Sequence, residues 1–196
     1  MSVCARESWT LWVSLLGLLL AGCATPEDDY FGNTRSRANV FVSPARNSIV
    51  VNKVAVMPFK AQTELIGTSV SDLFVTEVLR AGKYELVERS QMAKVLSEAE
   101  LSLAGLSATR AAEIGNMLGA DGVIIGTVDE FSTVAQRGTP YPVVGVTARM
   151  IECKSGKIIW SVDLAKRADS KVSTLPEHAR AIVHEMMCGL YKKWHP

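Results

Sequence analysis

The sequence predicts an α/β fold in which a mixed β-sheet is flanked by helices and ends in a C-terminal hairpin and an amphipathic helix. The unbroken apolar run Gly122–Val128 is typical of a central strand covered on both faces. Around it, β-branched segments and segments with helical apolar spacing follow the order β-α-β-α-α-β-β-β-α. The 196 residues are 48% hydrophobic with a formal net charge of +1, so we expect one folded domain and no nucleic-acid partner.

The first half of the predicted domain alternates strands and helices. Lys53–Phe59 is a β-branched run that predicts a buried strand, and Tyr84–Val87 predicts a shorter one. Between them, apolar residues recur every three or four positions over 66–81, which predicts a helix. Gly82 is expected to end this helix.

Two more helices are expected before the central strand. Ser90 is a candidate N-cap for a helix from Gln91 to about Leu101. Ser107 is a candidate N-cap for a second helix over Ala108–Leu118, which Gly119 would end.

The second half predicts a hairpin and a long helix. Alternating apolar residues in Val143–Cys153 and Ile158–Leu164 predict antiparallel strands joined by a tight turn. Thr174 and Glu177 have the spacing of a capping box, and the apolar residues after them follow helical spacing as far as Trp194.

The N-terminal segment predicts a lipoprotein signal peptide over residues 1–22. Leu11–Leu20 is almost wholly apolar but shorter than the ~20 residues that a membrane-spanning helix needs. The motif Leu20-Ala21-Gly22-Cys23 resembles a bacterial lipobox, so Cys23 is expected to be acylated and to anchor the chain in membrane lipid. An ordinary signal peptide followed by a chance cysteine is the alternative. Ala24 stands where an inner-membrane retention signal would have Asp, which by analogy implies the periplasmic face of the outer membrane.

Residues 23–47 are predicted to form the lipidated cysteine and a flexible tether, and residues 48–196 the folded domain. Ala24–Arg46 is rich in polar residues and shows no sustained period. In the mature chain Cys153 and Cys188 would remain in an oxidising compartment. They could form one disulfide or stay as two buried free thiols, because sequence does not show how close their Cα atoms lie.

The sequence offers no catalytic, metal or cofactor site. His178 and His184 are six positions apart on a predicted helix, and no cysteine or acid completes a ligand set. No glycine-rich phosphate loop, nucleophile elbow or paired carboxylates stand out. We therefore expect a protein that is not an enzyme and binds no cofactor.

The end of the last helix carries two cations between two aromatic residues: Tyr191, Lys192, Lys193 and Trp194. In one interpretation the helix packs on the sheet and the lysines complement the helix dipole. In the other, these four residues contact the membrane surface or a neighbouring subunit.

Four motifs in this order resemble the CsgG superfamily of bacterial envelope lipoproteins: Val54–Phe59, Leu86–Gln91, Ala112–Gly122 and Gly126–Val128. The resemblance covers about Val54 to Val162. It implies a periplasmic α/β domain that assembles side by side into rings and serves the export or assembly of surface material. It also implies that Glu88 and Arg89 hold a strand–helix junction rather than perform chemistry.

One departure from the family bears on function. The curli secretion channel inserts two membrane hairpins, each needing ~20 residues or more. Here the corresponding connections are Ser132–Pro142, with 11 residues, and Arg167–Thr174, with 8. The chain is therefore expected to form no pore of its own.

Within the superfamily, Tyr141–Val146 and Gly156–Trp160 are similar to the short, pore-less PelC-type members. This similarity implies a homo-oligomeric scaffold for export of an exopolysaccharide or fibre, with an outer-membrane porin or export machinery as partner. The alternative is an activator of a cell-wall peptidoglycan synthase, as in LpoB-type members. Those usually carry a long Pro-rich spacer, whereas a tether of about 23 residues spans at most ~80 Å.

Overall fold

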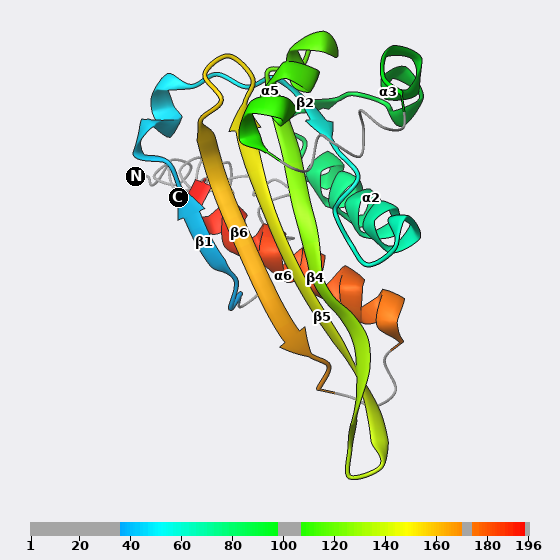
Figure 1. The fold of residues 1–196 in the computed structure, drawn as a ribbon. Helices are drawn as coiled ribbons and strands as arrows, with labels where there is room; N and C mark the ends of the chain where they lie inside the picture. Colours follow the sequence, from blue (N-terminus) through cyan, green and yellow to red (C-terminus); the bar gives the residue numbers. More distant parts are fainter. Residues whose placement is uncertain (1–35, 98–106, 170–173, 195–196) are drawn as a thin grey trace, which may run out of the picture.

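The computed structural model describes residues 36–97, 107–169 and 174–194, and its core is one six-stranded mixed sheet (Figure 1). The order across the sheet is β1-β6-β5-β4-β2-β3. β2 pairs in parallel with β3 and β4, whereas β4, β5, β6 and β1 pair antiparallel. The strands are β1 (Asn39–Val42), β2 (Lys53–Val56), β3 (Glu85–Leu86), β4 (Gly122–Gln136), β5 (Thr139–Glu152) and β6 (Ile158–Arg167).

Helices cover both faces of the sheet, so the predicted α/β fold class is confirmed. α2 (Glu64–Arg80) and α6 (Leu175–Trp194) pack on one face, where they form the larger apolar cluster with β4, β5 and β6. α3 (Arg89–Val95) and α5 (Ala108–Met117) pack on the other face against β2 and β4. Among the described residues, no helix is both long and apolar enough to span a membrane.

Most of the expected helix boundaries are confirmed by hydrogen bonds. The Ser107 hydroxyl accepts from the Arg110 amide at 3.2 Å, as an N-cap of α5. Gly82, with a φ of 61°, follows the end of α2. In the capping box, the Thr174 amide donates to Glu177 Oε2 at 2.8 Å. The reciprocal bond runs from the Glu177 amide to the Thr174 hydroxyl at 3.4 Å.

The prediction for the helix expected from Gln91 was wrong at its start. α3 begins at Arg89, with Glu88 in the N-cap position, so Ser90 lies inside the first turn and is not the cap. The α-helix ends at Val95, earlier than expected, and Leu101 lies outside the described residues.

The folded domain begins earlier than the sequence predicted. Residues expected to belong to the tether form β1 and the short 3₁₀ helix η1 (Pro44–Ser48). β1 pairs with β6, and its Val40 is buried in the larger apolar cluster at 7% exposure. Its Val42 packs partly buried against the same cluster. Four residues with two inward apolar side chains are too few to show a period, which is why the pattern gave no strand here.

The connection Ser132–Pro142, expected to be a gap between strands, is a two-stranded arm that extends beyond the body of the domain (Figure 1). β4 and β5 stay paired as far as Gln136 and Thr139, and the two turn residues both have positive φ: 52° at Arg137 and 76° at Gly138. Positive φ at both central positions is the geometry of a type I′ hairpin turn.

Pro142 does not break the arm, because its backbone faces away from β4. Its carbonyl accepts from the Ala168 amide at 2.8 Å, so its nitrogen also points to the β6 side. β6 ends at Arg167, and Pro140 has the same orientation two residues further out. A proline nitrogen directed to an unpaired edge loses no ladder hydrogen bond.

Candidate functional site

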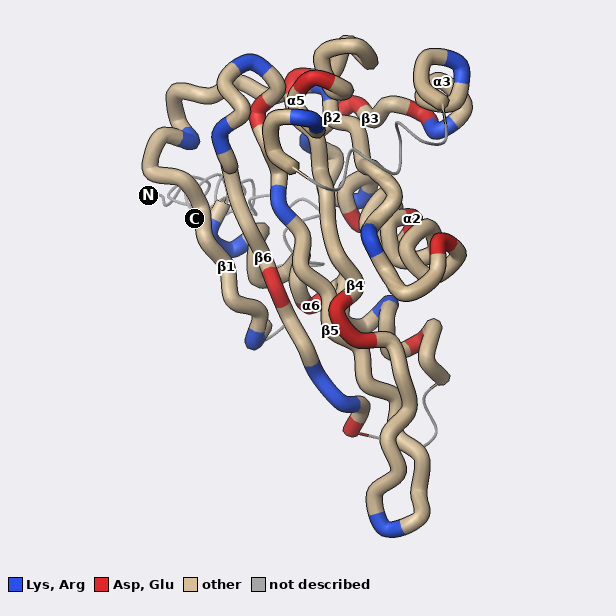
Figure 2. Tube along the Cα trace, viewed as in Figure 1, with Lys and Arg blue, Asp and Glu red and all other residues tan. Residues whose placement is uncertain are grey.

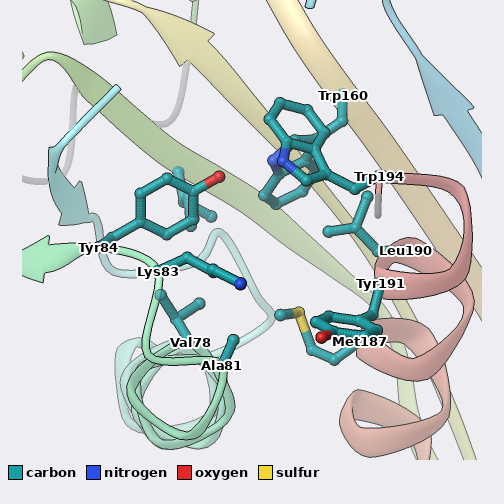
Figure 3. Close-up of a pocket in the computed structure, with 10 residues that line it drawn as sticks. Val78, Ala81, Lys83, Tyr84, Trp160, Met187, Leu190, Tyr191 and Trp194 are labelled. Atoms are coloured by element: carbon teal, nitrogen blue, oxygen red, sulfur yellow. The ribbon is translucent and has the colours of Figure 1, made fainter. Parts of the chain in front are cut away.

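The last turns of α6 cover an apolar pocket between the sheet and α2 (Figure 3). The helix contributes two aromatic residues, Tyr191 and Trp194, and the sheet contributes the fully buried Trp160. Lys83 and Tyr84, from the loop after α2, lie across the pocket from Trp194. The remaining lining residues are aliphatic or sulfur-containing: Val78, Ala81, Ile124, Met187 and Leu190.

A more open cavity of about 400 Å³ adjoins this pocket and shares Lys83, Tyr84 and Trp194 with it. Its other walls come from η1 and the loop that follows, and they include Arg46 and the exposed Val50. Burial raises the pKa of Tyr84 to about 12, so its phenol stays neutral at physiological pH. This open cavity is therefore lined by the aromatic rings of Tyr84 and Trp194 and by two cationic side chains, Lys83 and Arg46.

The end of α6 is fastened to the N-terminal part of the domain. Lys193 Nζ donates to the Val40 carbonyl at 2.8 Å, and Arg46 Nη1 donates to the Lys193 carbonyl at 3.4 Å. Tyr191 and Trp194 are half-buried against the larger apolar cluster, whereas Lys192 is exposed. Packing of the helix on the sheet is thus present. Contact of these residues with a membrane or a subunit stays a prediction.

The disulfide that the sequence left open is not formed. Cys153 and Cys188 are buried free thiols in the apolar clusters on opposite faces of the sheet. Burial, reinforced by the negative charges of Asp121 and Glu152, raises the pKa of the Cys153 thiol to about 11. Cys23 lies outside the described residues, so its acylation stays a prediction.

A chain of polar contacts that sequence did not predict joins α2 to α6. Glu77, only 3% exposed, accepts from Arg80 Nη1 at 2.9 Å, and its Oε2 lies 3.2 Å from His184 Nδ1. His184 Nε2 in turn lies 3.5 Å from Cys188 Sγ. Acid, histidine and thiol follow the order of a catalytic triad, but Cys188 has no exposed surface on which a substrate could react.

The other histidine of α6 is also structural. His178 is buried, and its Nε2 lies 2.8 Å from the Lys166 carbonyl at the end of β6. Across the described residues, histidines, cysteines and acids form no group of three that could hold a metal ion.

Arg89 has the position that the family resemblance implied. From the first turn of α3, its guanidinium lies 3.4 Å from the Asp72 carboxylate and 3.4 Å from the Thr68 hydroxyl, both on α2. These long, partly exposed contacts join the β3–α3 junction to α2, which packs on the other face of the sheet.

Within the described parts of the chain, no helix covers the β1, β6 and β5 half of the sheet on the α5 side. In Figure 1 this face of β1, β6 and β5 is turned toward the viewer, with α6 behind the sheet. Small polar side chains and single charges occupy it, including Ser161, Asp163, Thr147 and Arg149. Figure 2 shows acidic and basic residues interspersed here without a field of one sign. Phe41, 53% exposed, is the large apolar residue on this face of β1.

Comparison with known proteins agrees with this architecture. The family model described as curli production assembly/transport component CsgG matches residues 38–176. No curated protein matches the chain.

Solved structures that are similar to this chain have low sequence identity to it. The PelC dodecamer from Paraburkholderia phytofirmans has a TM-score of 0.56 and 18% identity, covering 80% of this chain and 98% of that chain. Lipoprotein GNA1162 from Neisseria meningitidis has a TM-score of 0.50 and 21% identity, covering 68% and 96%. The LpoB C-terminal domain from Salmonella enterica has a TM-score of 0.44 and 18% identity, covering 60% and 84%.

Because the family model spans well over half of the sequence, the resemblance found in the motifs is confirmed. At these identities the PelC and GNA1162 structures, with TM-scores of 0.56 and 0.50, establish a likeness of fold. The chain belongs to the CsgG family, and its fold is similar to that of PelC.

Proposed function

We propose that this protein is an outer-membrane lipoprotein, acylated at Cys23 and facing the periplasm, whose domain self-associates as a scaffold for export or assembly of an extracellular polymer. It acts without catalysis and without forming a membrane pore of its own. The lipobox-like motif before Cys23 supports the anchor, and membership of the CsgG family supports the export role.

The observation that carries the scaffold role is the uncovered sheet face of β1, β6 and β5. An antiparallel sheet can leave one face in water, but this face combines small polar residues with the exposed Phe41. A flat surface of this kind suits contact with another protein surface. The described residues give no comparable support for catalysis. In the Glu77–His184–Cys188 chain of contacts, the Cys188 side chain is fully buried, so a substrate could not reach its thiol.

Native mass spectrometry of the purified lipoprotein in detergent tests self-association. We expect one multimer of defined subunit number across a wide range of protein concentration. A strict monomer at the highest concentration would contradict the scaffold role.

The exported material requires a test in cells. Deletion of the gene is expected to reduce polysaccharide or fibre at the cell surface, and the wild-type gene, but not Cys23→Ser, should restore it. Unchanged surface polymer with reduced peptidoglycan cross-linking would instead favour the activator of a cell-wall synthase.

A further inference from the structure

The two edges of the sheet carry complementary features. On one edge, β1 presents an exposed aromatic side chain; around the other edge, α2, β3 and α3 enclose a groove with an apolar floor. We infer that Phe41 of one copy docks into this groove of a second copy, so that the chain self-associates head to tail. The inference rests on the proposed self-association and identifies the surfaces that make it.

Phe41 is placed for contact outside its own chain. In β1, Val40 points into the larger apolar cluster and is 7% exposed, whereas Phe41 points to the uncovered face and is 53% exposed. Its cross-strand neighbour is Ser161, which offers no apolar cover. Burial of such a side chain against an apolar surface of a second copy is favourable. An outward Phe on an edge strand is otherwise a liability for a soluble domain.

The groove at the opposite edge has a volume of about 270 Å³, which is ample for one aromatic ring. Val75 and Leu79 of α2 form one wall, and Leu86 and Met92 lie across from them on β3 and α3. Leu79 is 57% exposed, so the wall is accessible from solvent.

Charge and position both favour a second copy as the occupant. The groove rim carries the carboxylates of Asp72 and Glu88 and the guanidinium of Arg89, which lies 3.4 Å from the Asp72 carboxylate. The formal charge of the rim is therefore negative, and the exposed Arg37 precedes the strand that presents Phe41. Figure 1 shows β1 and the α2–α3 pair on opposite sides of the sheet. A contact between two different edges is heterologous, and repeating it generates rings when the rotation closes.

One aromatic residue does not make an interface by itself. A stable contact of standard size buries roughly 800 Å² on each partner. We therefore expect the uncovered face of β6 beside Phe41, which includes Ser161 and Asp163, to pack against the neighbouring copy around the groove.

Two single variants of the full lipoprotein test the inference. Phe41→Asp removes the docking side chain and keeps the groove, and Leu79→Asp spoils the groove and keeps Phe41. Each variant alone is expected to be monomeric in native mass spectrometry. Mixed in equal amounts, they should form a dimer, because each supplies the surface that the other lacks.

Leu65→Asp is the matched control. Leu65 is 75% exposed in the first turn of α2, roughly 21 Å along the helix axis from Leu79, and lies outside the groove. This variant should keep the wild-type subunit number. All three changed side chains are exposed, and unchanged circular dichroism and Tm would confirm that each variant is folded.

The outcomes separate this inference from the proposed function. A multimeric wild type whose mass is unaffected by Phe41→Asp would overturn the docking model and leave the scaffold role standing. Two monomeric variants that fail to pair when mixed would also overturn it. A monomeric wild type would overturn both.

Discussion

Glu77 shows how one buried charge can connect two helices. Its carboxylate lies between Arg80 on its own helix and His184 on α6. We expect Glu77→Ala to lower the free energy of unfolding by about 1–3 kcal/mol, because a buried acceptor is lost and its partners must be rehydrated. Urea denaturation followed by circular dichroism measures this loss.

Arg80→Ala provides the comparison for Glu77→Ala. The Arg80 side chain is 49% exposed, so its ion pair with Glu77 is screened by water. We expect this variant to lose less than about 1 kcal/mol. A loss equal to or greater than that of Glu77→Ala would contradict the view that the carboxylate, rather than the ion pair, matters most.

Glu177 makes the stability of the protein depend on pH in the acidic range, through the N-terminus of α6. Hydrogen bonds from the backbone amide and hydroxyl of Thr174 hold the pKa of this carboxyl below its usual value. A lowered folded-state pKa means that the stabilisation is present above the unfolded-state value of about 4.3 and is lost as pH falls below it. Glu177→Gln should therefore show a shallower fall in urea midpoint than wild type between roughly pH 5 and pH 3. Identical slopes in the two proteins would show that the capping box does not titrate as described.

At the scale of elements, periodicity predicted the segments in which many side chains share one environment. α2, α5 and the β5–β6 hairpin are long enough for their apolar residues to repeat, and their caps are local in sequence. β1 could not be found in this way, because its four residues are held by pairing with β6, more than a hundred positions later. Sequence patterns carry no information about such a distant partner.

The arm shows a different limit. Pro140 and Pro142 are usually signs of a loop, and here they are accommodated because their nitrogens face an edge without a partner strand. The turn residues Arg137-Gly138 were a weak signal, since arginine is not favoured at positive φ. The end of α6 was only partly predictable: its packing was one of two interpretations, while the bond from Lys193 to Val40 depends on the unforeseen β1.

The turn of the arm can be tested directly. Gly138 has a φ of 76°, and an added Cβ would meet open space, so Gly138→Ala should act through backbone strain alone, by about 1 kcal/mol. The arm projects from the core, so the expected effect is local: faster hydrogen exchange of amides over 131–142 with little change in global Tm. Gly156→Ala is the matched control, because it has a similar φ of 68° and open space at the turn between β5 and β6. Equal acceleration of arm exchange in both variants would argue against a local effect.

At the scale of the whole molecule, the start of the domain fixes how far it can stand from its anchor. The Ser36 hydroxyl donates to the Glu185 carbonyl at 2.7 Å, and the Arg37 amide donates to the Glu185 carboxylate at 2.8 Å. The fold is thus tied to α6 from its first described residues. Only the 12 residues of 24–35 separate these contacts from Cys23, and they span at most roughly 45 Å. This reach is shorter than the sequence alone implied and strengthens the expectation of action close to the membrane.

Replacing the anchor should therefore change where the protein resides without changing how it folds. Cys23→Ser is expected to move the protein from the membrane fraction to the soluble fraction and to abolish labelling by radioactive palmitate. Its Tm should match that of wild type, because the described contacts of the domain begin at Ser36. Cys4→Ser is the matched control: this cysteine lies in the predicted signal peptide, so the variant should remain membrane-bound and labelled. If Cys23→Ser stayed in the membrane fraction after washing with high salt, the mass of the variant would identify the attachment. A mass that includes residues 1–22 would point to the uncleaved signal peptide, and a mass without them would point to the folded domain, where the aromatic and basic cavity beside Trp194 is the first surface to test.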